Sequence, residues 1–173
     1  MSVIDKAIAA VTPPESEKAR AEATRKAEAI AGSGDWLAMA LDHHRQIRAA
    51  FTAAEEADPV LRLAAMQELA LILVGHAQAE EIVLYPALAK ADKKSHAMMG
   101  YTEQTAVKMQ MAELERLDPA SEEWTDKLVH IRGAVLHHMF EEEGDWFIEL
   151  KENAEDQDML TKRFAEEFSR YVT

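Results

Sequence analysis

The sequence of 173 residues contains no cysteine, which excludes disulfide bonds, thiolate metal ligands and cysteine nucleophiles. Any metal binding or catalysis must therefore use histidine and carboxylate side chains. Glycine and proline are scarce, at 6 and 5 residues, so few positions carry the residues that end helices. No apolar run is long enough to span a membrane, and we expect neither a membrane span nor an N-terminal targeting segment. A cytoplasmic location fits this composition.

Positive charge is also in short supply. The chain has 19 Lys and Arg residues against 32 Asp and Glu residues, which leaves a formal net charge of -13. Such a charge repels phosphate backbones and anionic membrane surfaces, so we predict that the chain binds neither nucleic acid nor membrane. The length fits about one domain, and the 48% hydrophobic content is enough for a substantial core.

The residues that are abundant favour helices almost everywhere. Alanine, leucine, glutamate and lysine are common, and apolar residues recur at i, i+3, i+4 and i+7. The sequence therefore predicts an all-α, up-down four-helix bundle at residues 35–153. An N-terminal helical extension at 1–34 includes a short amphipathic piece from Val3 to Val11, and a C-terminal helix at 154–173 is expected to cover the bundle. The four long helices are expected at 35–57, 58–86, 92–117 and 118–153.

An internal repeat relates the second and fourth of these helices. Asp58-Pro59, a helix-start signal, recurs 60 residues later as Asp118-Pro119. His76 and Glu80 recur 61 residues later as His137 and Glu141. We interpret the pattern as two related helical hairpins.

The same mapping relates the first helix to the third. It places Gln104 opposite His44, so that a glutamine stands where a fourth histidine would be expected.

Each His-x-x-x-Glu motif puts an imidazole and a carboxylate on one face of its helix. A single such motif is usually a solvated pair, but both motifs here lie on apolar stripes. Carboxylates that point into a core must be neutralised, either by a cation or by a basic side chain such as Lys108 or Arg132. With His44 from the first helix, the two motifs favour a bound metal ion.

Three segments carry a family resemblance: LDHHRQIRAAF, GHAQAEEIVLYP and LHHMFEEEGDWF. They resemble the histidine-bearing helices of the bacterial hemerythrin family, the HHE cation-binding domain, over about residues 35–153. The resemblance implies a four-helix bundle that holds two iron ions bridged by carboxylates and an oxo or hydroxo group, with manganese as the competing metal. The implied metal ligands are His44, His76, Glu80, His137 and Glu141. The spacing to Ile47 and Phe51 selects His44 over His43.

The third helix departs from the family pattern, which has a glutamate and a histidine after a tyrosine. This chain has Tyr101, Glu103 and Gln104 at these positions. The missing ligand has four alternatives: water, Glu103, the Gln104 carbonyl oxygen and the Tyr101 hydroxyl. The three side chains would either replace the ligand or lie in the second coordination sphere.

The implied ligands leave an open centre, because seven donor atoms serve about twelve positions on two octahedral irons. This favours peroxide or oxygen reduction over oxygen storage, although the sequence leaves open whether the protein is an enzyme. The expected small ligands are dioxygen, peroxide and nitric oxide, and the chain is expected to be a monomer or weak dimer. One alternative is an iron or redox sensor, or stress-response regulator, that acts on a protein partner through a helical surface. Another is an interaction module whose metal site has decayed.

Overall fold

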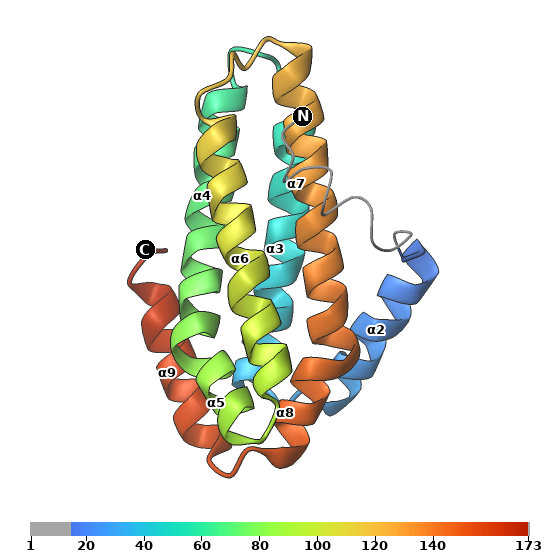
Figure 1. Ribbon diagram of the computed structural model, residues 1–173, viewed down its shortest axis with the longest axis vertical. Coiled ribbons are helices and arrows are strands. Elements are labelled where there is room, and N and C mark those ends of the chain that lie inside the picture. Colours follow the sequence, from blue (N-terminus) through green and yellow to red (C-terminus); the bar gives the residue numbers. More distant parts are fainter. Residues whose placement is uncertain (1–14, 173) are drawn as a thin grey trace.

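The computed structural model describes residues 15–172 and confirms the predicted all-α bundle with flanking helices (Figure 1). The amphipathic piece expected at Val3 to Val11 lies outside the described residues. Four helical rods run up and down side by side, and two of them continue through a short π-helix (η) into a final α-helix. The rods are α3 (Trp36–Glu56); α4 (Arg62–Ala79) with η1 (Glu80–Leu84) and α5 (Tyr85–Lys90); α6 (Lys94–Leu114); and α7 (Glu122–Glu141) with η2 (Glu142–Trp146) and α8 (Phe147–Asn153).

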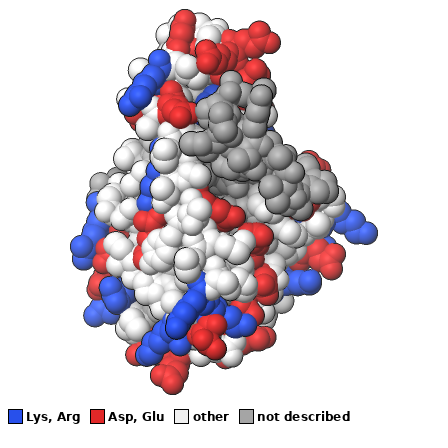
Figure 2. Space-filling view, viewed as in Figure 1, with Lys and Arg blue, Asp and Glu red and all other residues white. Residues whose placement is uncertain are grey.

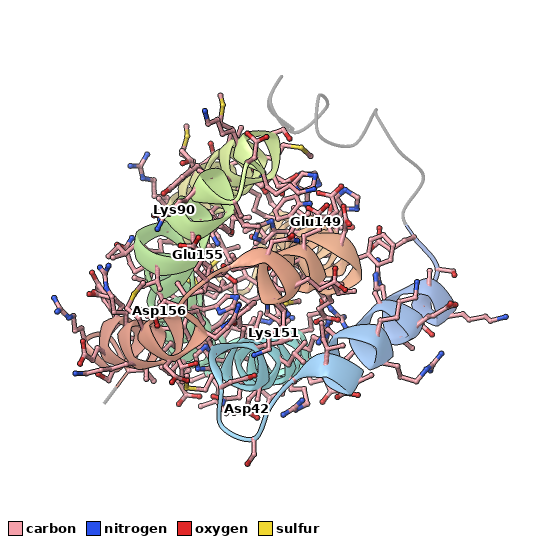
Figure 3. The ribbon with its side chains drawn as sticks, turned by 90° about the horizontal axis from the view of Figure 1, so that it is seen from below. Asp42, Lys90, Glu149, Lys151, Glu155 and Asp156 are labelled. Carbon is pink, nitrogen blue, oxygen red and sulfur yellow. The ribbon has the colours of Figure 1, made fainter. Side chains whose placement is uncertain are left out.

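Two further helices, α2 (Glu17–Ile30) and α9 (Gln157–Ser169), lie on opposite sides of the bundle (Figures 1 and 3). Helix α2 packs against η2, and α9 packs against α3 and α4. Gly75 on α4 allows this second contact, because a Cβ at Gly75 would lie 3.3 Å from the ring of Phe168 on α9 and 2.8 Å from a methyl carbon of Val172 just after it. Helix α9 thus packs along two rods of the bundle.

The start of α3 is held by Asp35. Its carboxylate accepts a hydrogen bond from the Ala38 N–H (2.8 Å), which is the standard N-cap contact, and a second one from the Gly32 N–H (2.7 Å) of the preceding turn. Lys151 from α8 adds an ion pair of 2.7 Å to the same carboxylate. Figure 3 looks at this end of the bundle and labels Lys151. The cap therefore also ties the first rod to the last.

The two Asp-Pro signals do not begin helices, contrary to the sequence prediction. Each Asp-Pro pair instead lies in a turn just before its helix. In these turns the Leu61 N–H donates to the Asp58 carbonyl (2.7 Å) and the Ser121 N–H donates to the Asp118 carbonyl (2.9 Å). Proline at the second position of such a turn is favoured by its fixed φ angle. Helix α4 then begins at Arg62, and α7 begins after Ser121, whose hydroxyl caps it.

Buried apolar side chains form two separate clusters along the bundle. The first surrounds Trp36, Leu84 and Phe147, at the end where α5 and α8 lie. The second surrounds Phe51 and Trp124, at the opposite end. Between them each of α3, α4 and α7 contributes buried histidine or glutamate. The core is therefore apolar at both ends and polar in the middle.

The face formed by α4 and α6 carries acidic and basic side chains around a largely uncharged area (Figure 2). Exposed apolar side chains on these two helices include Leu71, Val74, Met98 and Met109. None of the helices within residues 15–172 is long and apolar enough to cross a membrane.

Candidate metal centre

Both helices that bring a glutamate into the core contain a π turn that begins at that glutamate. The Tyr85 N–H donates to the Glu80 carbonyl, and the Phe147 N–H donates to the Glu142 carbonyl, each across five residues. An inserted residue of this kind changes the direction of the side chains that follow, and π turns occur frequently at functional sites. The two turns start 62 residues apart.

The first half of the polar cluster comes from α3, α4 and η1. The Nε2 atoms of His44 and His76 lie 3.0 Å apart, and His76 Nε2 lies 3.2 Å from Glu80 Oε1. All three side chains are at most 5% exposed. Two imidazole nitrogens and a carboxylate oxygen thus converge on one buried point.

The second half comes from α7 and η2. His138 Nε2 lies 3.2 Å from Glu142 Oε1, and the other oxygen, Glu142 Oε2, lies 3.4 Å from His44 Nε2. Tyr85 joins the halves, because its hydroxyl donates to Glu142 Oε1 (3.0 Å). Gln104 from α6 donates to Glu80 Oε2 (2.6 Å). All four long rods therefore supply a side chain to the cluster.

Carboxylates outside the cluster orient two of its histidines. Glu143 Oε1 lies 2.7 Å from His44 Nδ1 and also accepts from Arg48 (2.7 Å). Glu103 Oε2 lies 2.7 Å from His138 Nδ1. A hydrogen bond of this kind places the proton on Nδ1 and leaves the Nε2 lone pair pointing inward. Both rings are thereby prepared to act as ligands.

Burial dominates the electrostatics of the centre. It raises the pKa of Glu80 well above the usual value, and the neighbouring charge of Glu142 raises it further. Burial opposes ionisation of Glu142 too, but His138 and His44 lower its pKa below the usual value. Burial and the charge of His44 lower the pKa of His76. The two carboxylates thus compete for the positive charge available to them.

The residues present fit a bound cation. Glu80 Oε1 and Glu142 Oε2 are buried, and neither accepts a hydrogen bond within the described residues. Lys108 and Arg132, the two basic side chains considered from the sequence, pair instead with Glu81 (2.6 Å) and Glu55 (2.5 Å). His44, His76, Glu80 and Glu142 each offer a ligand atom within 4.8 Å of the others. Nitrogen and carboxylate oxygen donors together suit iron and manganese.

His137 and Glu141, expected in the core from the sequence, do not lie in this cluster. The His137 side chain is 39% exposed and the Glu141 side chain is 26% exposed. Their neighbours His138 and Glu142 occupy the core instead, at 8% and 0% exposure.

The physical reason is the phase of α7. Consecutive residues on an α-helix differ in direction by about 100°. The buried residues Leu128, Ile131 and Val135 lead at spacings of three and four to His138 and Glu142. Val129, which lies eight residues before His137 on the same side of α7, is 53% exposed. Because two histidines are followed by a run of glutamates, the His-x-x-x-Glu motif fits either His137 with Glu141 or His138 with Glu142. The line of buried apolar residues on α7 leads to the second pair.

The remaining residues singled out on the third helix have different surroundings. Gln104 lies in the cluster. Glu103 lies outside the cluster and contacts one of its members, His138. The Tyr101 hydroxyl instead donates to the Glu81 carbonyl (2.7 Å) at the surface. Sequence reasoning missed Tyr85, although a signal existed: an aromatic residue follows Glu80 and Glu142 at the same spacing, as Tyr85 and Phe147.

A known protein family matches the part of the chain that contains the cluster. The model of the hemerythrin HHE cation-binding domain matches residues 37–150, which include every residue of the cluster. The chain belongs to this family. It is therefore a helical-bundle member of a cation-binding family, and the buried His and Glu side chains of its polar layer could hold a metal ion.

A relative of this hemerythrin-family chain is a DNA nickase from Nostoc sp. (strain PCC 7120 / SAG 25.82 / UTEX 2576). The two are 28% identical over 96 residues, which cover 56% of this chain and 27% of the relative. The match thus spans about a quarter of the relative's length. No solved structure matches the chain.

Proposed function

We propose that this chain is a non-haem di-iron protein that handles dioxygen, peroxide or nitric oxide in the middle of its bundle. The proposed ligands are His44, His76, Glu80, His138 and Glu142, with manganese as the competing metal. The observation that carries the proposal is the pair of fully buried carboxylates, each with an oxygen lacking a hydrogen-bond partner among the described residues. Buried carboxylates with an unbonded oxygen are costly, and bound cations remove that cost.

An apolar cavity of about 180 Å³ leads to this centre between α4 and α6. Its inner end is lined by His76, Gln104 and His138, and its walls include Val107 and Met111. Such walls admit a small uncharged ligand and exclude bulk water. Iron held at the inner end would supply reversible binding or reduction of that ligand.

The chain's own residues would order the ligand and its protons. The Tyr85 hydroxyl donates to Glu142 Oε1 (3.0 Å) and accepts from Gln104 (2.7 Å), so one proton is held beside the Glu142 carboxylate. Gln104 adds a second N–H contact at Glu80. Gln104 stands where the family pattern has a histidine ligand, and the exogenous molecule would take the coordination position that this histidine fills in the family.

Adjacent residues of α7 provide a matched test of the ligand set. We expect two iron ions per wild-type chain by elemental analysis, with an absorption spectrum that changes on adding peroxide. His138→Ala and Glu142→Ala should lose both the iron and the spectrum. His137→Ala and Glu141→Ala, one position away on the same helix, should keep them. If instead the second pair of variants lost the buried iron and the first pair kept it, the proposed ligand set would be wrong.

A second candidate function is sensing of iron or redox state. His43, next to His44, stacks on Phe168 of α9 at 3.6 Å between ring centroids, and Glu143 hydrogen bonds with Thr24 of α2. Both flanking helices therefore touch the surroundings of the centre. A sensor should show a change in the protease sensitivity of α2 or α9 on iron loading, whereas a peroxide or oxygen reductase need not.

The matched relative is named a DNA nickase, but the net charge of -13 argues against DNA binding by this chain. We therefore propose that the shared segment reflects the common bundle and not a nicking activity. Conversion of supercoiled plasmid by the metal-loaded chain, lost in His138→Ala, would contradict this.

A further inference from the structure

A second group of metal-binding side chains lies beside the buried centre. Glu103 of α6 and His137 and Glu141 of α7 each offer a ligand atom within 4.8 Å of the others. These side chains are 26% to 39% exposed, so the group is open to solvent. It is separate from the buried centre but adjoins it, because Glu103 also contacts His138 Nδ1.

The His137 ring is oriented like the buried ligands. Its Nδ1 lies 2.9 Å from Glu15 Oε2, and its Nε2 lies 3.8 Å from Glu141 Oε1. His44 and His138 show the same arrangement, with a carboxylate on Nδ1 and Nε2 directed at other carboxylates. A carboxylate that holds the Nδ1 proton is the usual outer partner of a metal-bound histidine. The Glu15 contact therefore prepares His137 Nε2 for a cation.

The charge of the group points the same way. Within residues 15–172, neither Glu103 nor Glu141 forms an ion pair with a lysine or arginine. Glu141 Oε2 is buried and accepts no hydrogen bond from these residues. By contrast, the group of His96, Asp145 and Glu149 already has the ammonium group of Lys93 on Glu149. Within residues 15–172, the basic groups in contact with these two carboxylates are imidazoles, His138 on Glu103 and His137 on Glu141.

We propose that Glu103, His137 and Glu141 form an outer site for a divalent first-row transition-metal ion, with Glu15 as the residue that positions His137. One nitrogen and two carboxylate oxygens leave room for water on the ion, so the site exchanges its cation readily. Because Glu103 touches both sites, a cation held here lies next to the ligands of the buried centre. The site goes beyond the proposed function and does not depend on the buried centre being loaded.

Titration with Zn²⁺ by calorimetry tests the site, using the full chain after it has been loaded with iron. We expect one zinc ion per chain beyond the iron, and a dissociation constant at least about tenfold higher in His137→Ala and Glu141→Gln. Glu15→Gln should also raise the dissociation constant of this zinc ion by about tenfold, because His137 loses the carboxylate that positions it. His130→Ala, two turns away on α7, is the control and should bind zinc like the wild type.

Iron measured in the same samples keeps the two proposals apart. Loss of the iron in His138→Ala would show that the buried centre binds iron. Weaker zinc binding in His137→Ala would show that the outer site binds zinc. Identical zinc titrations of the wild type and His137→Ala would overturn the outer site, because His137 would then be a neighbour of Glu15 and Glu141 and not a metal ligand. If the wild-type chain holds no iron, the zinc comparison is made on the metal-free chain and decides the outer site in the same way.

Discussion

At the scale of single residues, the centre depends on carboxylates that touch the histidines from outside. Glu143 is fully buried and contacts three groups: His44, Arg48 and Thr24. Its position relative to Glu142 repeats that of Glu81 relative to Glu80, but Glu81 pairs with Lys108 nearer the surface. The same residue type in the same local motif therefore serves different partners in the two halves of the repeat.

We predict that Glu143→Gln weakens metal binding without abolishing it. Glutamine retains the shape but loses the charge that holds the proton on His44 Nδ1, and loss of such partners typically costs about 10- to 100-fold in affinity. Competition with a chelator of known affinity measures the change. Glu152→Gln, an exposed position on α8, is the control. Equal affinities for wild type and Glu143→Gln would show that the contact does not orient the ligand.

At the scale of elements, the position of Tyr85 requires a glycine on the facing helix. A Cβ at Gly100 of α6 would lie 2.6 Å from a carbon of the Tyr85 ring, closer than side chains approach. Tyr85 is fully buried, so its ring has little room to retreat. Gly100 thus lets α5 and α6 approach closely enough for the Tyr85 hydroxyl to reach Gln104 and Glu142.

Two glycine substitutions separate this contact from helix propensity. Alanine favours a helix over glycine by about 1 kcal/mol, so Gly133→Ala on α7, where a Cβ meets nothing within 4 Å, should stabilise the fold by up to that amount. Gly100→Ala should instead destabilise it by about 1–3 kcal/mol, because overpacking forces the ring to move. Urea unfolding of the metal-free variants measures both. A stabilised Gly100→Ala would mean that Tyr85 moves at little cost.

At the scale of the whole molecule, the bundle contains a buried polar layer between two apolar clusters. Each apolar cluster favours folding through burial, whereas the polar layer contributes a cost unless its charges are balanced. A cation that binds only the folded chain offsets this cost through mass action. Folding and metal binding are therefore expected to be coupled.

We predict that iron loading raises the melting temperature. One ion present at a hundred times its dissociation constant adds about 2.7 kcal/mol, which corresponds to about 5–10 °C for a chain of this size. Differential scanning calorimetry with and without a chelator measures the shift. His138→Ala, which should not hold the buried ions, should melt at the same temperature in both conditions. An unchanged wild-type melting temperature would instead favour the interpretation of a decayed site.

Much of the architecture follows from the sequence alone. The 3.6-residue apolar period and the scarcity of glycine and proline are local properties, and they suffice for the four long helices and the two flanking ones. His44, His76, Glu80 and Gln104 lie where the stripes on their helices lead, so local periodicity placed them as well. The family pattern added the kind of metal that such side chains are expected to bind.

Tertiary structure alone decided three features: the inward turn of His138 and Glu142 in place of His137 and Glu141, the approach of Tyr85, and the joining of Glu103 to both groups of ligands. Adjacent residues on a helix differ by only one position in the sequence but by about 100° in direction. Which of them faces the core depends on how α7 packs against α3 and α6. These are contacts between segments far apart in the chain, and a local pattern does not contain them.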